Sequence, residues 1–162
     1  MRRAEVADIP ELARLREALW PDSGAASHQA ELEQALGHPD EVTVIFMVRA
    51  SSGDAAGFAE AALRHDYVNG CETSPVTFLE GIYVEPTHRR EGVARRLVEA
   101  VEHWGAERGC REFASDAILD NEVSHRMHAA LGFEETERVV FFRKPLTKLD
   151  GVRPGTDEGI SG

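Results

Sequence analysis

Two segments of the chain carry apolar residues at the spacing of a helix. In residues 9–19 the first of them comes directly after Asp8, which suits an N-cap, and Pro10 suits the first helical turn. In residues 92–108 the same spacing recurs, and Gly109 follows as a helix terminator. The pattern predicts two amphipathic helices, with core-facing residues Ile9, Leu12, Leu15 and Leu19 in the first and Val93, Leu97, Val101 and Trp104 in the second.

The other apolar stretches are shorter and are bounded by turn residues, which predicts mostly strands. We expect strands at 2–6, 42–48, 56–64, 76–84, 111–115 and 136–143, and two further helices at 27–36 and 121–130. This order, βααβββαβαβ, predicts a single α/β domain with a mixed central sheet flanked by helices on both faces. We assign the domain to residues 1–147 and expect the tail, residues 148–162, to be disordered, because Gly, Pro, Asp and Ser dominate it without periodicity.

A short basic turn, Arg89-Arg90-Glu91-Gly92-Val93-Ala94, joins the strand expected at 76–84 to the second amphipathic helix. The first N–H groups of a helix lack intrahelical partners, and the helix dipole adds partial positive charge there. Gly92 has no Cβ to block close approach, so this turn could hold a phosphate. An ordinary strand-to-helix connection with solvated arginines is the alternative. The sequence lacks the Gly-Lys pair of a triphosphatase loop and the three glycines of a dinucleotide-binding turn.

Composition and charge limit the classes of function. Apolar residues make up 42% and charged residues 29% of the 162 residues, as in ordinary soluble proteins. A net charge of −11 argues against nucleic acid as a partner and is compatible with a cationic substrate or with solubility alone. Because no apolar run approaches the ~20 residues that cross a bilayer and no signal-peptide pattern opens the chain, we expect no membrane contact and a cytoplasmic location. Two cysteines, Cys71 and Cys110, predict neither a metal site nor a disulfide framework.

Two motifs follow each other in a defined order. The turn reads R-x-x-G-x-A, and later Asn121, Ser124, His125 and His128 lead into Leu131-Gly132-Phe133. Together they resemble the pyrophosphate-binding signature and the second cofactor element of the GCN5-related N-acetyltransferase (GNAT) superfamily. The resemblance implies acetyl-CoA as co-substrate and no metal. It also implies cofactor contacts from Ile82, Tyr83, Val84, Arg89, Arg90, Glu91, Gly92, Val93, Ala94, Arg95 and Asn121.

Two longer segments narrow the resemblance from the superfamily to one family within it. Arg64-His65-Asp66-Tyr67-Val68-Asn69-Gly70-Cys71 and Gly132-Phe133-Glu134-Glu135-Thr136-Glu137-Arg138 are similar to segments of the aminoglycoside 6′-N-acetyltransferases. This family resemblance implies that Trp20 and Tyr67 line the substrate cleft, and that the carboxylates of Glu80, Asp116 and Glu137 contact the ammonium and hydroxyl groups of the substrate, since charge-assisted hydrogen bonds are strong. The alternatives are that the two aromatic residues belong to the core and that Glu137 is merely solvated. Glu80 is harder to explain that way, because it interrupts an apolar strand.

The chemistry implied is direct attack of the 6′-amine on acetyl-CoA in a ternary complex. A carboxylate must take a proton from the amine, and Glu80 and Asp116 are the candidates, with Glu80 favoured by its place on the central strand. Backbone N–H groups near residues 82–84 would polarise the thioester carbonyl. Many GNAT members protonate the leaving thiolate with a tyrosine. His128 stands at that position here, either as the acid or without a proton role.

The last expected strand, with Val139, Val140, Phe141 and Phe142, is apolar on both faces, which would be hazardous if left exposed. The resemblance implies a homodimer through this region, with Glu137 near the partner's cleft; a monomer that buries this strand in its own sheet is the alternative. Two other functions stay open: acetylation of another small polyamine or amino sugar, and a non-catalytic acyl-CoA sensor. A sensor would not need the three carboxylates.

Overall fold

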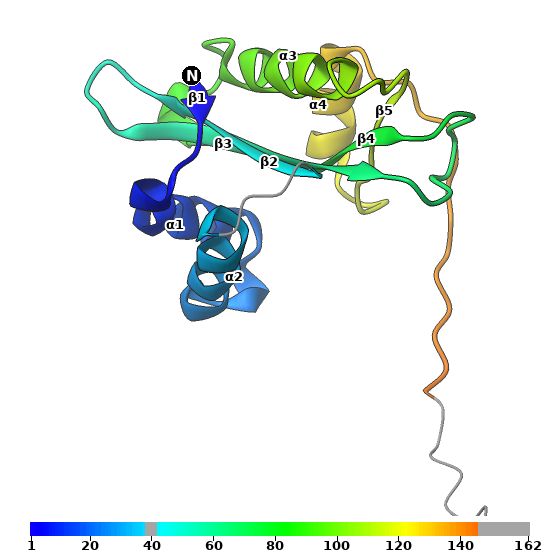
Figure 1. The fold of residues 1–162 in the computed structure, drawn as a ribbon, viewed down its shortest axis with the longest axis horizontal. Coiled ribbons are helices and arrows are strands. Elements are labelled where there is room, and N and C mark those ends of the chain that lie inside the picture. The colour runs from blue at the N-terminus through cyan, green and yellow to red at the C-terminus, as the bar shows by residue number, and fades with distance from the viewer. Residues whose placement is uncertain (38–41, 146–162) are drawn as a thin grey trace, which may run out of the picture.

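A five-stranded sheet separates two layers of helices. The computed structural model describes residues 1–37 and 42–145, and its strands are β1 (Arg2–Arg3), β2 (Thr43–Arg49), β3 (Ala55–Arg64), β4 (Val76–Val84) and β5 (Phe113–Ser115). They lie in the order β1-β2-β3-β4-β5, antiparallel except for the parallel pair β4–β5 (Figure 1). The sheet is therefore mixed, as predicted.

Helices cover both faces of this sheet, which confirms the predicted fold class. One face carries α1 (Ile9–Leu19) and α2 (Ala25–Gly37), and the other carries α3 (Val93–Ala106), with α4 (Glu122–Leu131) beside it (Figure 1). Within residues 1–37 and 42–145, short 3-10 turns connect these elements at Val6–Asp8, Pro21–Ser23 and Pro86–His88. No helix in the described part of the chain is long and apolar enough to span a membrane.

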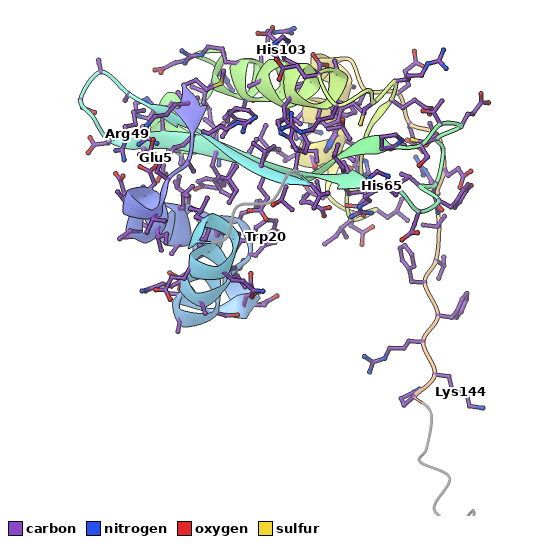
Figure 2. The ribbon with its side chains drawn as sticks, viewed as in Figure 1. Glu5, Trp20, Arg49, His65, His103 and Lys144 are labelled. Carbon is purple, nitrogen blue, oxygen red and sulfur yellow. The ribbon has the colours of Figure 1, made fainter. Side chains whose placement is uncertain are left out.

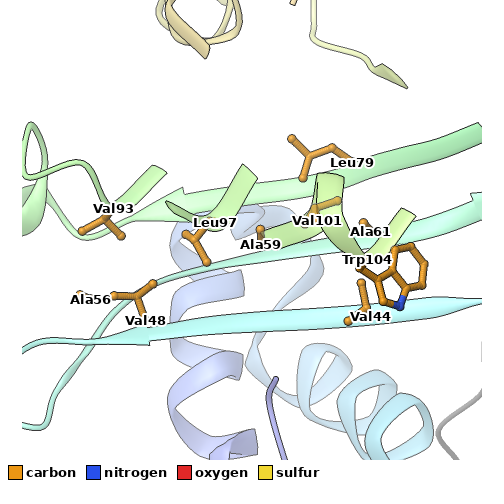
Figure 3. Packing of buried hydrophobic residues seen from close by; sticks show 10 residues of the cluster. All are labelled: Val44, Val48, Ala56, Ala59, Ala61, Leu79, Val93, Leu97, Val101 and Trp104. Carbon is orange, nitrogen blue, oxygen red and sulfur yellow. The ribbon is translucent and has the colours of Figure 1, made fainter. Parts of the chain in front are cut away.

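The core beneath α3 follows the predicted stripe. The four residues that repeat at helical spacing are all buried and meet the small and branched residues of β2, β3 and β4 (Figure 3). Leu97 and Val101 are fully buried. Burying such a side chain contributes about 1.5–3 kcal/mol, so this layer fixes the axis of α3 against the sheet. The position of the α3 N-terminus beside the end of β4 follows from that packing.

Asp8 is the N-cap residue of α1, as predicted, but its side chain has another role. Its side chain does not cap α1; it accepts hydrogen bonds from the N–H of Glu5 at 2.9 Å and from the guanidinium groups of Arg2 and Arg49 at 2.7 and 2.8 Å. Burial raises the pKa of Asp8, but these hydrogen bonds outweigh it and lower the pKa to about 2. A 3-10 turn occupies Val6–Asp8, and β1 ends at Arg3 rather than at Val6 as predicted.

The predicted strand at residues 136–143 is wrong for the isolated chain. Residues 133–145 contain no strand. The segment first packs against the domain, with Phe133 on Phe113 and Thr136 on Gly70, and then extends away from the sheet (Figure 1), as far as Lys144 at the labelled end in Figure 2. The sequence has the right residues, but within the described part of the chain no neighbouring strand pairs with them. Phe142 is 93% exposed. The tail predicted to be disordered, 148–162, lies outside the described residues.

Candidate active site

Strand β4 carries one extra residue at Glu80. In the β3–β4 pair Ala61 faces Leu79 and Glu60 faces Gly81, so Glu80 is skipped as a β-bulge. Bulges bend a strand and redirect a side chain, and they are common beside active sites. The register explains how a glutamate can interrupt an otherwise apolar strand: it leaves the regular alternation.

Strands β4 and β5 separate at the same point. Their last paired residues are Leu79 and Ser115, whereas β4 continues for five more residues, to Val84. Along this stretch no described strand pairs with the β5 side of β4. Backbone polar groups that lack a ladder partner are available to a ligand. We call this opening, bounded by residues 80–84 and the end of β5, the fork.

The cofactor residues predicted on β4 are Ile82, Tyr83 and Val84. Their backbone borders the fork, and their side chains pack into the core on the two faces of the sheet. Ile82 and Val84 contact the core beneath α3, and Tyr83 contacts the cluster beneath α1. The carbonyl of Val84 accepts a hydrogen bond from Arg89 Nε at 3.1 Å. The side chains thus fix the strand and leave main-chain groups on the β5 side of β4 for binding, which suits the backbone role expected for residues 82–84.

The turn before α3 forms an open cradle. Arg90 and Gly92 have left-handed backbones, with φ of 67° and 76°, which is uncommon for a non-glycine residue. Among the residues that the structure describes, no side chain caps α3, and the first-turn N–H groups of Val93, Ala94 and Arg95 have no intrahelical partners. A Cβ added to Gly92 would meet nothing within 4 Å. N–H donors without intrahelical partners, beside the empty space at Gly92, suit an anion such as a pyrophosphate.

Neighbouring charged side chains hold this cradle in place. Arg95 donates to the carbonyl of Ala130 at 3.2 Å and so joins α3 to the last turn of α4. Glu91 contacts His88 at 3.2 Å. These contacts give Arg95 and Glu91 roles in positioning the turn, beside the cofactor role predicted for them.

Glu80 is paired with Arg64, the last residue of β3. Its two carboxylate oxygens lie 2.9 and 3.0 Å from Arg64 Nη2, and the guanidinium stacks 3.3 Å from the ring centroid of Phe78. This arrangement orients the carboxylate and supplies a countercharge in the absence of substrate. A cationic amine that approaches Glu80 must share it with Arg64. Sequence reasoning missed Arg64, because its pairing depends on the bulge.

Trp20 lies against the strand residue that follows Glu80. A Cβ on Gly81 would come within 2.6 Å of Trp20 Cζ2, so only glycine lets the indole lie on β4 here. The rings of Trp20 and Phe58 pack edge to face, with their centroids 6.4 Å apart. The backbone carbonyl oxygen of Trp20 lies 3.0 Å from His28 Nε2 (Trp20 is labelled in Figure 2). Trp20 is partly buried and belongs to the cluster beneath α1, so it combines a core contact with an exposed edge.

Tyr67 and Glu137 lie farther out. Tyr67 is 77% exposed, which rules out the core position considered for it. Glu137 is exposed in the extended segment, and its neighbour Thr136 packs against Gly70, where an added Cβ would be 2.6 Å from Thr136 Cβ. The loop of Tyr67 and the segment of Glu137 therefore lie side by side. In the described part of the chain, Glu80 forms its hydrogen bonds with Arg64 and none with Tyr67 or Glu137.

Helix α4 brings its residues to the other side of the fork. Asn121 is the N-cap and accepts from the N–H of Ser124 at 3.1 Å, a structural role alongside the predicted cofactor contact. His128 is half-buried, with its Nε2 2.9 Å from Ser115 Oγ. Asp116 follows directly after Ser115 and is exposed. The structure thus brings His128, Asp116 and Glu80 to the fork. Among the described residues, no cluster of three His, Cys, Asp or Glu could hold a metal ion.

Comparison with known proteins agrees with this geometry. Residues 9–133 match the model of the acetyltransferase (GNAT) family. The chain belongs to this family. GNAT relatives include the aminoglycoside N(6′)-acetyltransferase type 1 of Serratia marcescens, 53% identical over 132 residues, which are 82% of this chain and 89% of the relative. The enzyme of the same name from Stenotrophomonas maltophilia is 50% identical over 146 residues, 90% of this chain and 93% of the relative.

Solved structures give the same result. AAC(6′)-Iy in complex with the bisubstrate analogue CoA-S-monomethyl-acetylneamine superposes with a TM-score of 0.83 at 47% identity, covering 90% of this chain and 97% of that one. AAC(6′)-IG from Acinetobacter haemolyticus, without ligand, gives a TM-score of 0.85 at 46% identity, covering 90% and 98%. The resemblance inferred from the sequence motifs is confirmed.

Proposed function

We propose that this GNAT protein is an aminoglycoside 6′-N-acetyltransferase that confers resistance by transferring acetyl from acetyl-CoA to the 6′-amine. The observation that carries the proposal is the set of relatives with that activity in their names, at 43–53% identity over at least four-fifths of this chain. The fork, its bulged glutamate and the α3 cradle supply the parts that the reaction needs. A cytoplasmic location would give the enzyme its acetyl-CoA.

In this proposal the cradle holds the pyrophosphate of acetyl-CoA and the fork holds its pantetheine arm. The N–H groups from Arg90 to Ala94 provide donors and partial positive charge, and Gly92 leaves the space open. The main chain of residues 82–84 binds the arm and stabilises the oxyanion, because donors fixed in advance need no reorganisation during reaction. Asn121 contributes from the N-terminus of α4. Acetyl-CoA supplies the activated acyl group.

Glu80 is our candidate for the base that takes the proton from the amine, with Asp116 as the second candidate. Glu80 lies at the bulge where the fork opens, and Arg64 holds its carboxylate in position. Asp116, Glu137 and the aromatic residues Trp20 and Tyr67 bind the rest of the polycation. Charge-assisted contacts of this kind weaken with added salt.

Conservative variants separate these roles. Glu80→Gln should lower kcat itself by roughly 10²–10⁴-fold, as expected for loss of a general base. Asp116→Asn and Glu137→Gln should mainly raise KM, lowering kcat/KM about 10- to 100-fold for one lost charge-assisted hydrogen bond. All three should bind CoA like the wild type in calorimetry. If all three keep wild-type kcat and KM, the carboxylates do not bind the substrate.

We further propose that the enzyme is a homodimer that covers the extended C-terminal segment. Val140, Phe141 and Phe142 are 76%, 85% and 93% exposed in the single chain. An exposed apolar segment of strand-forming residues favours pairing with another chain. In such a dimer Glu137 would lie near the partner's cleft. Light scattering should give twice the 17.9 kDa of one chain; a mass near 17.9 kDa at micromolar concentration would reject the dimer.

Turnover with a panel of amines tests the activity. Purified protein should acetylate kanamycin and tobramycin with acetyl-CoA, and should use spermidine poorly; expression should raise the resistance of a susceptible bacterium to both antibiotics. Efficient turnover of spermidine without turnover of aminoglycosides would favour the polyamine alternative. CoA binding without turnover of any amine would favour the non-catalytic sensor.

A further inference from the structure

His128 lies in a hydrogen-bond chain that connects α4 to the fork. Its Nδ1 is 2.8 Å from the carbonyl oxygen of Ser124, and its Nε2 is 2.9 Å from Ser115 Oγ. Ser115 Oγ in turn lies 3.3 Å from the carbonyl oxygen of Leu79. A carbonyl can only accept, and its contact with Nδ1 is shorter than the 3.2 Å contact between Nδ1 and Ser124 Oγ, so we assign the proton of the neutral ring to Nδ1. With Nδ1 assigned as the donor to Ser124, Nε2 is the nitrogen that can exchange a proton with Ser115.

The Ser115 hydroxyl can serve both protonation states of that nitrogen. When His128 is neutral, the hydroxyl donates to Nε2. When His128 is charged, Nε2–H donates to Ser115 Oγ, and the hydroxyl turns to donate to Leu79. Only a hydroxyl proton rotates between the two arrangements, because a serine oxygen both donates and accepts. The ring itself is held by the edge-on contact with Phe133, 5.2 Å between centroids.

The hydrogen-bond chain from His128 ends at the fork, where the reaction would occur. Ser115 is the last residue of β5 and is paired with Leu79, and the next residue of β4 is the bulged Glu80. The relay and the proposed base therefore border the fork from its two strands, one residue apart in register. A group that supplies a proton and a group that removes one are both needed there.

We propose that Ser115 is a catalytic residue that delivers a proton to the departing thiolate of CoA, with His128 as its proton source. Ser115 Oγ–H breaks as S–H forms, and Oγ takes the proton from Nε2 of charged His128, which becomes neutral with its proton on Nδ1. Glu80 takes one proton from the attacking amine and returns it to solvent, and His128 takes one from solvent, so the cycle balances. The inference rests on the proposed function.

Nuclear magnetic resonance of the free protein gives a readout that needs no turnover. In selectively ¹⁵N-labelled protein the neutral His128 ring should carry its proton on Nδ1 and leave Nε2 unprotonated. A ring with its proton on Nε2 would overturn the relay, since that nitrogen could then not accept from Ser115. This result is independent of whether aminoglycosides are substrates.

Kinetics of Ser115→Ala and Ser115→Thr test the role in turnover. Ser115→Ala should lower kcat about 10- to 100-fold, leave both KM values within about two-fold, and remove the limb of the pH profile at which kcat falls as the acid deprotonates. Ser115→Thr keeps the hydroxyl and should retain at least about a third of kcat. Ser52→Ala, which removes a surface hydroxyl that bonds Asp54 at 2.8 Å, is the control and should behave like the wild type.

Three results would overturn the relay: unchanged kcat in Ser115→Ala, a loss of kcat in Ser115→Ala that keeps the wild-type pH profile, or equal losses in the alanine and threonine variants. The last two would indicate that Ser115 only supports the β4–β5 junction. An inactive wild-type protein would instead reject the proposed function, and the two failures are thus distinguishable.

Discussion

Gly92 and Gly109 lie at opposite ends of α3 and provide a matched pair for testing the cofactor cradle. Both have left-handed backbones, with φ of 76° and 81°, and at both an added Cβ meets nothing within 4 Å. An alanine at either position costs conformational strain of about 1–2 kcal/mol, because an L-residue disfavours this region. The two substitutions should therefore lower the free energy of unfolding by similar amounts. Only Gly92 faces the proposed pyrophosphate site.

The two variants should differ in CoA affinity. In Gly92→Ala the new methyl group occupies space that the pyrophosphate needs, and displacing one hydrogen bond to a charged group costs about 1.5–3 kcal/mol. CoA should bind roughly 10- to 100-fold more weakly, and more weakly still to the β-branched Gly92→Val. Gly109→Ala should bind CoA like the wild type. Calorimetric titration of CoA, with urea denaturation of each protein, measures both quantities.

Two outcomes would refute this reasoning. Unchanged CoA affinity in both Gly92 variants would remove the pyrophosphate from this turn. Equal losses of affinity in Gly92→Ala and Gly109→Ala would show that strain transmitted through α3, not obstruction at its N-terminus, controls binding.

Three further predictions test packing, pH dependence and assembly. Gly81→Ala should displace Trp20, lower stability by about 1–3 kcal/mol and raise KM for aminoglycoside but not for acetyl-CoA, measured by denaturation and steady-state kinetics. Asp8→Asn should lower the free energy of unfolding by about 2 kcal/mol at pH 7. Because the folded pKa of Asp8, about 2, lies below its unfolded value of about 3.9, that stability is present above pH ~4 and disappears as the pH falls towards 2, so urea midpoints of wild type and variant should converge on acidification. Replacing Phe141 and Phe142 by serine should shift light-scattering mass from dimer to monomer, whereas an unchanged mass would place the interface elsewhere.

Local patterns predicted the parts of the fold that depend on local sequence. The stripe from Val93 to Trp104 gave α3 to within two residues at each end, since one face of a helix records its core contacts directly. The last strand was mispredicted for the opposite reason. A strand needs a partner, and residues 136–143 have none in the described part of the single chain.

Within the site, the sequence identified which residues have suitable chemistry better than it identified which residues contact one another. Glu80 stood out because it interrupts an apolar strand, but the bulge that redirects it depends on its register with β3. The pairing with Arg64, sixteen residues away, depends on the same register. Ser115 received no functional prediction from the sequence, because its significance comes from a contact with His128 on another element. Contacts of this kind arise only when separate elements are assembled.

The position of the acetyl group on the product tests the proposed activity most directly. Kanamycin should be incubated with the purified protein and acetyl-CoA, and the product examined by two-dimensional nuclear magnetic resonance. We predict a single product acetylated at the 6′-amine, formed at least 10²-fold more slowly by Glu80→Gln, as expected for loss of a general base that contributes ~10²–10⁴-fold. Acetylation at another amine, or no product from a protein that binds CoA, would contradict the assignment.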